Sequence, residues 1–232
     1  SKGTSKDGKV KLKMYIAKGE DLKDIVPFPY NNDNYSVGHP TVSKDGKVLI
    51  FASDMPNGSG GVDLYYSVRI NDKQDWGRPV NLGRKVNTEG DEEFPFLDDN
   101  DVLYFSSNGL AGLGGLDVFS IQLKDLSPVG VPKNLGAPFN SSFDDFAFRY
   151  SDDKNGYFAS NRDYFNDDIY EFTQLNSIFK KQYTIAFEIR DSETKEYVPD
   201  SKVSVTDAKQ KIIYMSKFYF LLICEKLKQI WK

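Results

Sequence analysis

The stretch VLYFSSNGLAGLGGLDVFS, residues 102–120, contains four glycines, Gly109, Gly112, Gly114 and Gly115, within seven residues. Glycine-rich loops often cradle phosphate groups, but such a loop leads into a helix whose N-terminal N–H groups meet the anion. Here the glycines are followed by LDVFSI, residues 116–121, an alternating run of β-branched and aromatic residues that is typical of a strand. The stretch therefore predicts two strands joined by a glycine hairpin, not a nucleotide site.

The same phrase occurs three times. Residues 48–67 read VLIFASDMPNGSGGVDLYYS, and residues 156–172 read GYFASNRDYFNDDIYEF, a shorter version. The serines that end the first half of each phrase are 54 and 53 residues apart, and the aspartates that begin the second half are 54 and 51 residues apart. These structural repeat positions are Ser53, Ser107, Ser160, Asp63, Asp117 and Asp168. A period of this length indicates a repeat architecture.

The rest of the unit also repeats. The triplet Asn-Leu-Gly at 81–83 returns at 134–136, and an asparagine (Asn87 or Asn140) and an acidic cluster follow each triplet. Each unit offers about four short strands, and no segment between residues 38 and 172 has a helical period. In the first copy the expected strands are 40–42, 48–52, 63–69 and 79–82. Four antiparallel strands per repeat indicate a blade, so we predict an all-β chain with a partial β-propeller of about three four-stranded antiparallel blades.

The repeated motifs Gly-Gly-x-Asp-Leu/Val-Tyr/Phe, Pro-x-Asn-Leu-Gly and Gly-Asp-Glu-x-x-Pro resemble the WD40-like PD40 propeller repeats. They are most similar to the repeats of OmpA-family envelope proteins linked to the type IX secretion system, over residues 10–172. The resemblance implies a periplasmic, outer-membrane-associated protein of a Gram-negative cell with a protein or peptide partner in the envelope. In that family peptidoglycan is bound by a separate OmpA-like domain, which has no counterpart in this sequence.

The pattern divides the chain into successive parts. Residues 1–37 are expected to form the end of a preceding blade and a linker, the blades to span 38–90, 91–142 and 143–172, and a linker to follow at 173–181. Residues 182–214 resemble the start of a carboxypeptidase-regulatory-like β-sandwich, left incomplete because a sandwich needs about seven strands. The tail, 215–232, is atypical, and its apolar run at 218–224 is far shorter than the roughly twenty residues that span a bilayer. We therefore interpret the chain as an internal fragment of a longer protein.

The composition limits the kinds of ligand and metal site that the chain can form. A formal net charge of −4, with lysines concentrated at the two ends, argues against nucleic-acid binding. The single cysteine, Cys224, excludes an intrachain disulfide. The single histidine, His39, excludes a histidine-rich metal site, and we interpret it as a structural turn residue. The acidic clusters at 91–93 and 144–145 offer oxygen ligands for calcium but lack the spacing of a known calcium loop. We therefore interpret them as solvated turns and predict no metal site and no cofactor, with calcium as the alternative.

Two classes of function fit such a scaffold: a non-catalytic binding protein, and a hydrolase or lyase acting on glycans or peptides. An enzyme should break the repeat with a unique cluster of acids and bases, whereas the polar residues here recur at matching positions. The repeated serines and aspartates are interpreted as turn-forming. Specificity is expected in the loops that differ between blades. The candidate binding residues there are Met55, Asn57, Asn108, Leu110, Leu113, Arg162, Tyr164 and Phe165.

An open arc of blades is also expected to leave apolar side faces uncovered at its two ends. The residues expected on those faces are Phe51, Tyr65, Phe105 and Phe119. Such an arc should be weakly stable by itself or should associate.

Overall fold

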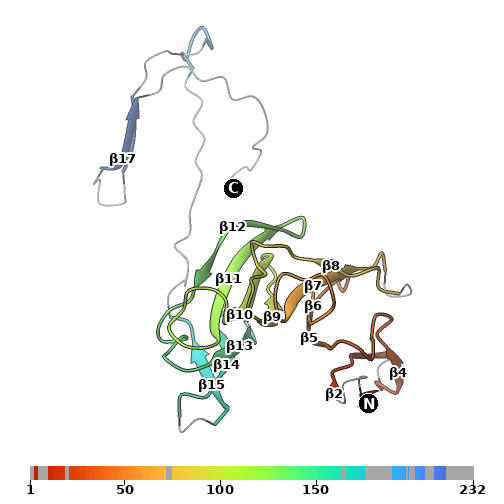
Figure 1. The fold of residues 1–232 in the computed structure, drawn as a ribbon. Helices are drawn as coiled ribbons and strands as arrows, with labels where there is room; N and C mark the ends of the chain where they lie inside the picture. Colours follow the sequence, from red (N-terminus) through yellow and green to blue (C-terminus); the bar gives the residue numbers. More distant parts are fainter. Residues whose placement is uncertain are drawn as a thin grey trace. The chain divides into compact units, whose positions relative to one another are not determined.

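The computed structural model describes residues 3–4, 10–18, 21–71, 75–163, 166–175, 190–196, 198, 202–206 and 212–217. Its contacts divide the chain into two compact units, Ser1–Ile178 and Phe179–Lys232. The described residues form strands, turns and loops without a helix, so the fold is all-β (Figure 1). In this part of the chain no helix is available that could cross a membrane.

Three antiparallel sheets follow one another along the first unit (Figure 1). The first sheet contains β5 (Val37–Val42), β6 (Val48–Ser53), β7 (Asp63–Val68) and β8 (Val80–Asn81). The second contains β9 (Glu92–Leu97), β10 (Val102–Ser107), β11 (Asp117–Lys124) and β12 (Ser127–Asn134). The third contains β13 (Asp145–Tyr150), β14 (Asn155–Ser160) and β15 (Asp168–Thr173). Within each sheet the spatial order is the chain order, which is the meander of a propeller blade.

The glycine loops join the second and third strands of these sheets, as the sequence predicted. Ser53 pairs with Asp63, Ser107 with Asp117 and Ser160 with Asp168, each pair at the mouth of its hairpin. The strand after the second loop begins at Asp117, and no helix begins at Gly115 or Leu116. The identical register in three sheets confirms that the three copies of the phrase are equivalent structural units.

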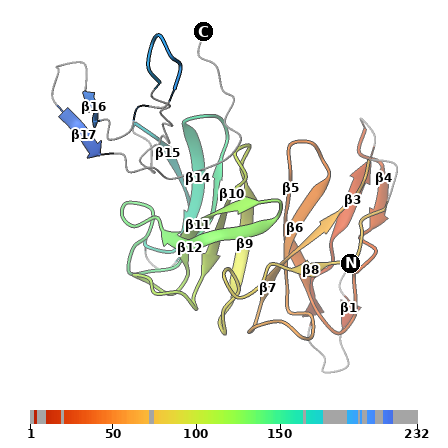
Figure 2. The ribbon, with the colours of Figure 1, turned by 90° about the horizontal axis from the view of Figure 1, so that it is seen from above.

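Successive side chains of the strands point to opposite faces of the first sheet and form two separate hydrophobic cores. Ile50 and Ala52 face the second sheet and pack with Leu103, Phe105 and Phe119. Residues on the opposite side of the first sheet pack against a preceding segment of the chain, and this second core contains Met14, Phe28, Val37, Leu49, Phe51, Tyr65 and Trp76. Figure 2 shows β5 and β9, the first strands of their sheets, as neighbours.

The expectation that Phe51, Tyr65, Phe105 and Phe119 lie on uncovered faces is wrong, because none of these residues exposes more than 4% of its surface. Phe51 and Tyr65 are covered by residues that precede β5, including Met14 and Phe28. Phe105 and Phe119 lie between the first and second sheets. The sequence shows the alternation of apolar residues but not which neighbouring segment covers them.

An aromatic cluster joins the second and third sheets. The ring of Phe148 lies 4.9 Å from Tyr104, 5.0 Å from Phe172 and 5.2 Å from Phe139, measured between centroids. The opposite face of the third sheet is open, since Ile169 is 79% exposed and Tyr157 40% exposed. On this face of the third sheet two apolar side chains are therefore exposed, beside the polar side chain of Glu171.

The remaining strands form three pairs. Before the first sheet, β1 (Gly3–Thr4) pairs with β2 (Val10–Lys11), and β3 (Tyr15–Lys18) pairs with β4 (Asp24–Pro27). In the second unit, β16 (Lys202–Thr206) and β17 (Ile212–Lys217) form an antiparallel pair. The strand expected at 183–189 and the tail after residue 217 lie outside the described residues.

Candidate functional site

The repeated serines and aspartates organise the hairpin loops. The carboxylate of Asp63 accepts hydrogen bonds from the N–H groups of Ser59 and Gly60, and Asp117 does the same with Leu113 and Gly114. The hydroxyl oxygens act at the other end of each loop. Ser53 accepts from the N–H of Met55 at 3.2 Å, Ser107 from that of Gly109 at 3.1 Å and Ser160 from that of Arg162 at 3.2 Å.

The third aspartate lies in a loop that is described only in part. Asp168 is exposed, and in the described part of its loop no N–H group bonds to its carboxylate. This loop is a few residues shorter than the other two and contains no glycine. The residues that correspond to the N–H donors of the first two loops, Tyr164 and Phe165, lie outside the described residues, so the loop-holding role of the aspartate is shown for Asp63 and Asp117.

The glycines permit close contact with the next blade. The carboxylate of Asp91 accepts a hydrogen bond from the N–H of Val62 at 2.9 Å, and Asp144 accepts one from Leu116 at 2.8 Å. A Cβ atom on Gly61 would overlap the Asp91 carboxylate, and one on Gly115 would overlap that of Asp144. The Gly-Gly pairs thus allow a carboxylate of the next blade to approach the backbone closely. A phosphate loop uses glycines for the same kind of close approach, which explains the resemblance in sequence.

The interpretation of the acidic clusters as solvated turns is wrong for two of their residues. Glu92 and Asp145 are completely buried. Glu92 accepts hydrogen bonds from the N–H and hydroxyl of Thr88 at 2.7 and 2.6 Å and from the Ser107 hydroxyl at 2.6 Å, while Asp145 pairs with Arg162. Burial raises the pKa of Glu92. Among the described residues, no group of three or more His, Cys, Asp or Glu side chains gathers to hold a metal ion.

Two buried asparagines have a role that sequence reasoning left unassigned. The side chain of Asn87 bonds to both the N–H and the carbonyl of Leu64, at 2.8 and 3.0 Å, and its amide also donates to Asn81 at 2.8 Å. Asn140 repeats the arrangement with Val118. Their recurrence after each Asn-Leu-Gly triplet was the available signal for this role.

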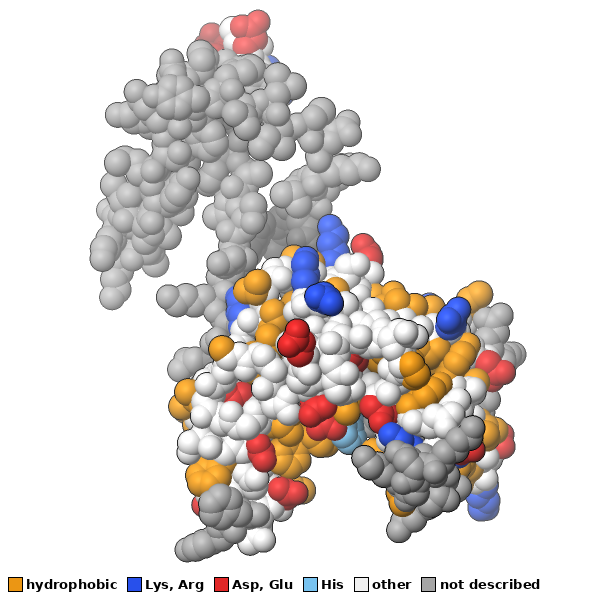
Figure 3. Space-filling model, in the orientation of Figure 1, with side chains coloured by type: hydrophobic (Ala, Val, Ile, Leu, Met, Phe, Trp, Pro, Cys, Tyr) orange, Lys and Arg blue, Asp and Glu red, His pale blue; other side chains and the backbone are white. Residues whose placement is uncertain are grey.

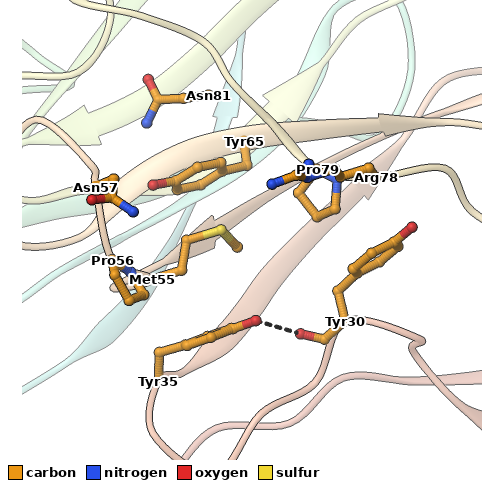
Figure 4. Close-up of a pocket in the computed structure, with 9 residues that line it drawn as sticks. All are labelled: Tyr30, Tyr35, Met55, Pro56, Asn57, Tyr65, Arg78, Pro79 and Asn81. Atoms are coloured by element: carbon orange, nitrogen blue, oxygen red, sulfur yellow. Dashed lines mark hydrogen bonds between the residues drawn. The ribbon is translucent and has the colours of Figure 1, made fainter.

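A pocket of about 580 Å³ lies beside the first glycine loop (Figure 4). It is lined by Tyr30, Tyr35, Met55, Pro56, Asn57, Tyr65, Arg78, Pro79 and Asn81. Two candidate binding residues, Met55 and Asn57, are therefore placed on one wall of it. The other walls come from the segment before β5, from β7 and from the chain that leads into β8. Those lining residues were not found from the sequence, because they are brought together only by packing.

The pocket is aromatic and carries one charge. Arg78 is the only ionised group in its lining, and its side chain makes no hydrogen bond or ion pair within the part of the chain that the structure describes. The Tyr35 hydroxyl donates to the carbonyl of Tyr30 at 3.3 Å, which fixes one wall. Tyr65 is 4% exposed, and burial raises the pKa of its hydroxyl, so it stays neutral at physiological pH.

The other candidate loop residues are placed differently. Asn108 bonds to Asp91, accepting from its N–H at 2.7 Å, and the Arg162 side chain binds Asp145 and the carbonyl of Phe139. Leu110 packs against the core between the first two sheets, and Leu113 is 58% exposed. Tyr164 and Phe165 lie outside the described residues.

His39 lies on a first strand, away from the glycine loop. It has a left-handed backbone with φ 49°, as do Phe94 at 51° and Ala147 at 53°, at bulges in the equivalent strands. Its ring stacks on Phe94 at 4.0 Å, and its Nδ1 lies 3.8 Å from Oε1 of Glu93, the one carboxylate within 4.0 Å among the described residues. Burial lowers the pKa of His39 and raises that of Glu93.

The surface charge is mixed. On the face seen in Figure 3, Lys and Arg side chains lie among Asp and Glu side chains and do not form one continuous basic groove.

Comparison with known proteins gives little further information. No family model and no curated protein matches the chain. A solved structure, a puromycin-hydrolyzing peptidase from Mycobacterium tuberculosis, is similar over 88% of this chain and 35% of that one, with a TM-score of 0.43 and 11% identity. The chain therefore spans about a third of that protein, and a likeness of this degree does not extend the peptidase activity to it.

Proposed function

We propose that the chain is a non-catalytic binding module that holds a protein or peptide in the pocket beside its first glycine loop. The observation that carries this proposal is the pocket itself, which combines three tyrosines, two prolines and a methionine with few polar groups. Concave, mostly apolar sites with a few placed polar groups are the usual form of binding sites, and tyrosine and arginine are common anchors in them.

The location of the pocket on a variable loop supports the proposal. Residues 55–57 differ from the corresponding residues of the other two hairpin loops, whereas the serine before the loop and the aspartate after it recur. A rigid repeated scaffold that presents a variable loop is a common design for recognition. The resemblance of the repeats supports a place in the periplasm, in an outer-membrane or peptidoglycan-associated assembly such as the type IX secretion system.

The non-catalytic part of the proposal is supported by how the acidic side chains are used. Asp63, Asp91, Asp117 and Asp144 each bond to loop N–H groups of their own or the adjacent blade. A catalytic triad consists of a nucleophile, a base and an orienting acid. Among the described residues, His39 is accompanied by the Glu93 carboxylate and the ring of Phe94, and this set does not form a triad.

Selection from a random peptide display library on the full chain tests this function. The wild type should enrich specific peptides, and the double variant Met55→Ser, Pro56→Ala should lose them. Leu113→Ser is the matched control, because Leu113 is an exposed residue of the equivalent loop outside the pocket. Equal enrichment by the double variant would reject the pocket, and turnover of ester, peptide or glycan substrates would favour the hydrolase or lyase alternative.

A further inference from the structure

We propose that the pocket selects a peptide in which an apolar side chain is adjacent to a carboxylate, and that Arg78 binds the carboxylate. This inference rests on the proposed function and specifies its ligand class.

The first argument is charge. Arg78 is the only ionised residue among the nine that line the pocket, and no Asp or Glu is among them. The carboxylate of Asp63, which lies behind the loop, is already occupied by the N–H groups of Ser59 and Gly60 and by the amide of Asn81. Among the described residues no carboxylate pairs with Arg78, and an anionic ligand would complement its positive charge.

The second argument is geometry. Figure 4 shows the guanidinium nitrogens of Arg78 turned toward Tyr65 and the interior of the group of lining residues. A guanidinium presents parallel N–H donors that match the two oxygens of a carboxylate. Tyr30, Tyr35 and Met55 supply the adjacent apolar wall, and methionine adapts its shape to different partners.

The size and charge of the pocket restrict the ligand further. A volume of about 580 Å³ falls within the range of small-ligand sites, so a few residues of a peptide fit and a folded domain does not. A phosphate group carries a charge of about −1.5 to −2 and is usually held by several cationic or N–H donors. With one cation among the described lining residues, a carboxylate is the better match.

The test uses two matched sets of fluorescein-labelled, acetylated and amidated pentapeptides on the full chain. In one set Phe, Leu, Tyr or Pro is followed by Glu, and in the other the Glu is replaced by Gln. We expect at least one Glu peptide to bind about tenfold more tightly than its Gln partner by fluorescence anisotropy, with a preference that weakens at high salt. Arg78→Gln should abolish the preference, and Arg78→Lys should keep part of it. Arg84→Gln is the control, since Arg84 is exposed and outside the lining.

The outcomes separate the two proposals. Equal binding of Glu and Gln peptides to the wild type, or an unchanged preference in Arg78→Gln, would overturn the carboxylate assignment. If library peptides still required Met55 and Pro56 in that case, the peptide-binding function would stand. A phosphoserine peptide that bound more tightly than its Glu counterpart would also overturn the assignment. Failure of both the library and the defined peptides would remove both proposals.

Discussion

His39 shows that a residue can stand out in the sequence for reasons unrelated to chemistry. Its Nδ1 is buried and has no hydrogen-bond partner among the described residues, and its left-handed backbone is shared by Phe94 and Ala147 at equivalent bulges. The position therefore requires a bulge and not an imidazole, and in the first two blades its side chain also stacks. A phenylalanine already occupies the position in the second blade.

Replacing His39 with Phe should leave stability at pH 7 unchanged or slightly increased. Because burial lowers the pKa of His39 in the folded state, the wild type loses stability as the pH falls through the unfolded value of 6.5, where the unfolded chain takes up the proton first. The difference in Tm between His39→Phe and wild type should grow between pH 7 and pH 5. Differential scanning fluorimetry checks this, and a constant difference across that range would contradict it.

Glu92 and Glu93 change the stability of the fold with pH in the opposite direction to His39, so they must be kept constant in that comparison. The raised pKa values of Glu92 and Glu93 favour the folded state below pH 4.5, and this contribution is lost as the pH rises through their folded pKa values. Both residues are retained in His39→Phe, so the effect of Glu92 cancels in the difference between the two proteins, whereas Glu93, whose Oε1 lies 3.8 Å from Nδ1 of His39, contributes to that difference.

Asn87→Ala and Asn140→Ala should each be strongly destabilising. Either change leaves a buried strand N–H, of Leu64 or of Val118, without its hydrogen-bond acceptor, while the carbonyl of the same residue keeps the bond from the N–H of Leu82 or Leu135. A loss of about 1–3 kcal/mol in the free energy of unfolding is expected for one buried N–H group left without an acceptor. Urea titration measures it, with Asn100→Ala in an exposed turn as the control expected within about 0.5 kcal/mol.

At the scale of elements, each glycine loop is a connector between blades as well as a hairpin. The second glycine of each Gly-Gly pair, Gly61 or Gly115, lies against the acidic turn of the next blade. The aspartate of that turn accepts a hydrogen bond from the N–H of the residue that follows the glycine. The repeated Gly-Gly and the repeated acidic cluster are thus two halves of one contact. They are distant within the period and recur together for that reason.

Gly115→Ala should therefore destabilise the contact between the second and third sheets. The added methyl group would overlap the Asp144 carboxylate, so we expect a loss of about 2 kcal/mol in the free energy of unfolding. Gly38→Ala is the control, because its Cβ would meet the flexible end of Leu12 at 3.2 Å and the Leu12 Cβ at an ordinary contact distance of 3.8 Å.

A double-mutant cycle with Asp144→Ala identifies the cause of that loss. Once the carboxylate is removed, the alanine at position 115 should cost much less, so the two changes should be non-additive. Strict additivity would show that the glycine is needed for another reason.

At the scale of the molecule, the third sheet has one covered and one open face. Tyr104 and Phe148 belong to the aromatic cluster on the covered face, whereas Ile169 is 79% exposed on the other. An exposed apolar sheet face is a site of association, since blades are stabilised by their neighbours.

Ile169→Lys should therefore reduce self-association of the chain. Sedimentation velocity at increasing protein concentration measures this, with the wild type expected to form larger species and the variant to remain monomeric over a wider range. Val131→Lys is the matched control, because Val131 is 75% exposed but belongs to β12 of the second sheet. A wild type that stays monomeric, or an equal effect of both variants, would contradict the role of this face.

The sequence by itself determined the period, the strands and the hairpins. Alternation and turn chemistry are local properties, so the pairing of Ser107 with Asp117 could be read from one stretch and extended to the other copies. Tertiary structure decided burial: Glu92 is enclosed where its turn meets Ser107 of the next strand, and Phe51 is covered by Met14 and Phe28 from an earlier segment. It also decided the pocket, whose walls are Tyr30, the loop at 55–57 and Arg78. Solvation and complementarity depend on which segments meet in space, and no local pattern in a single sequence specifies that meeting.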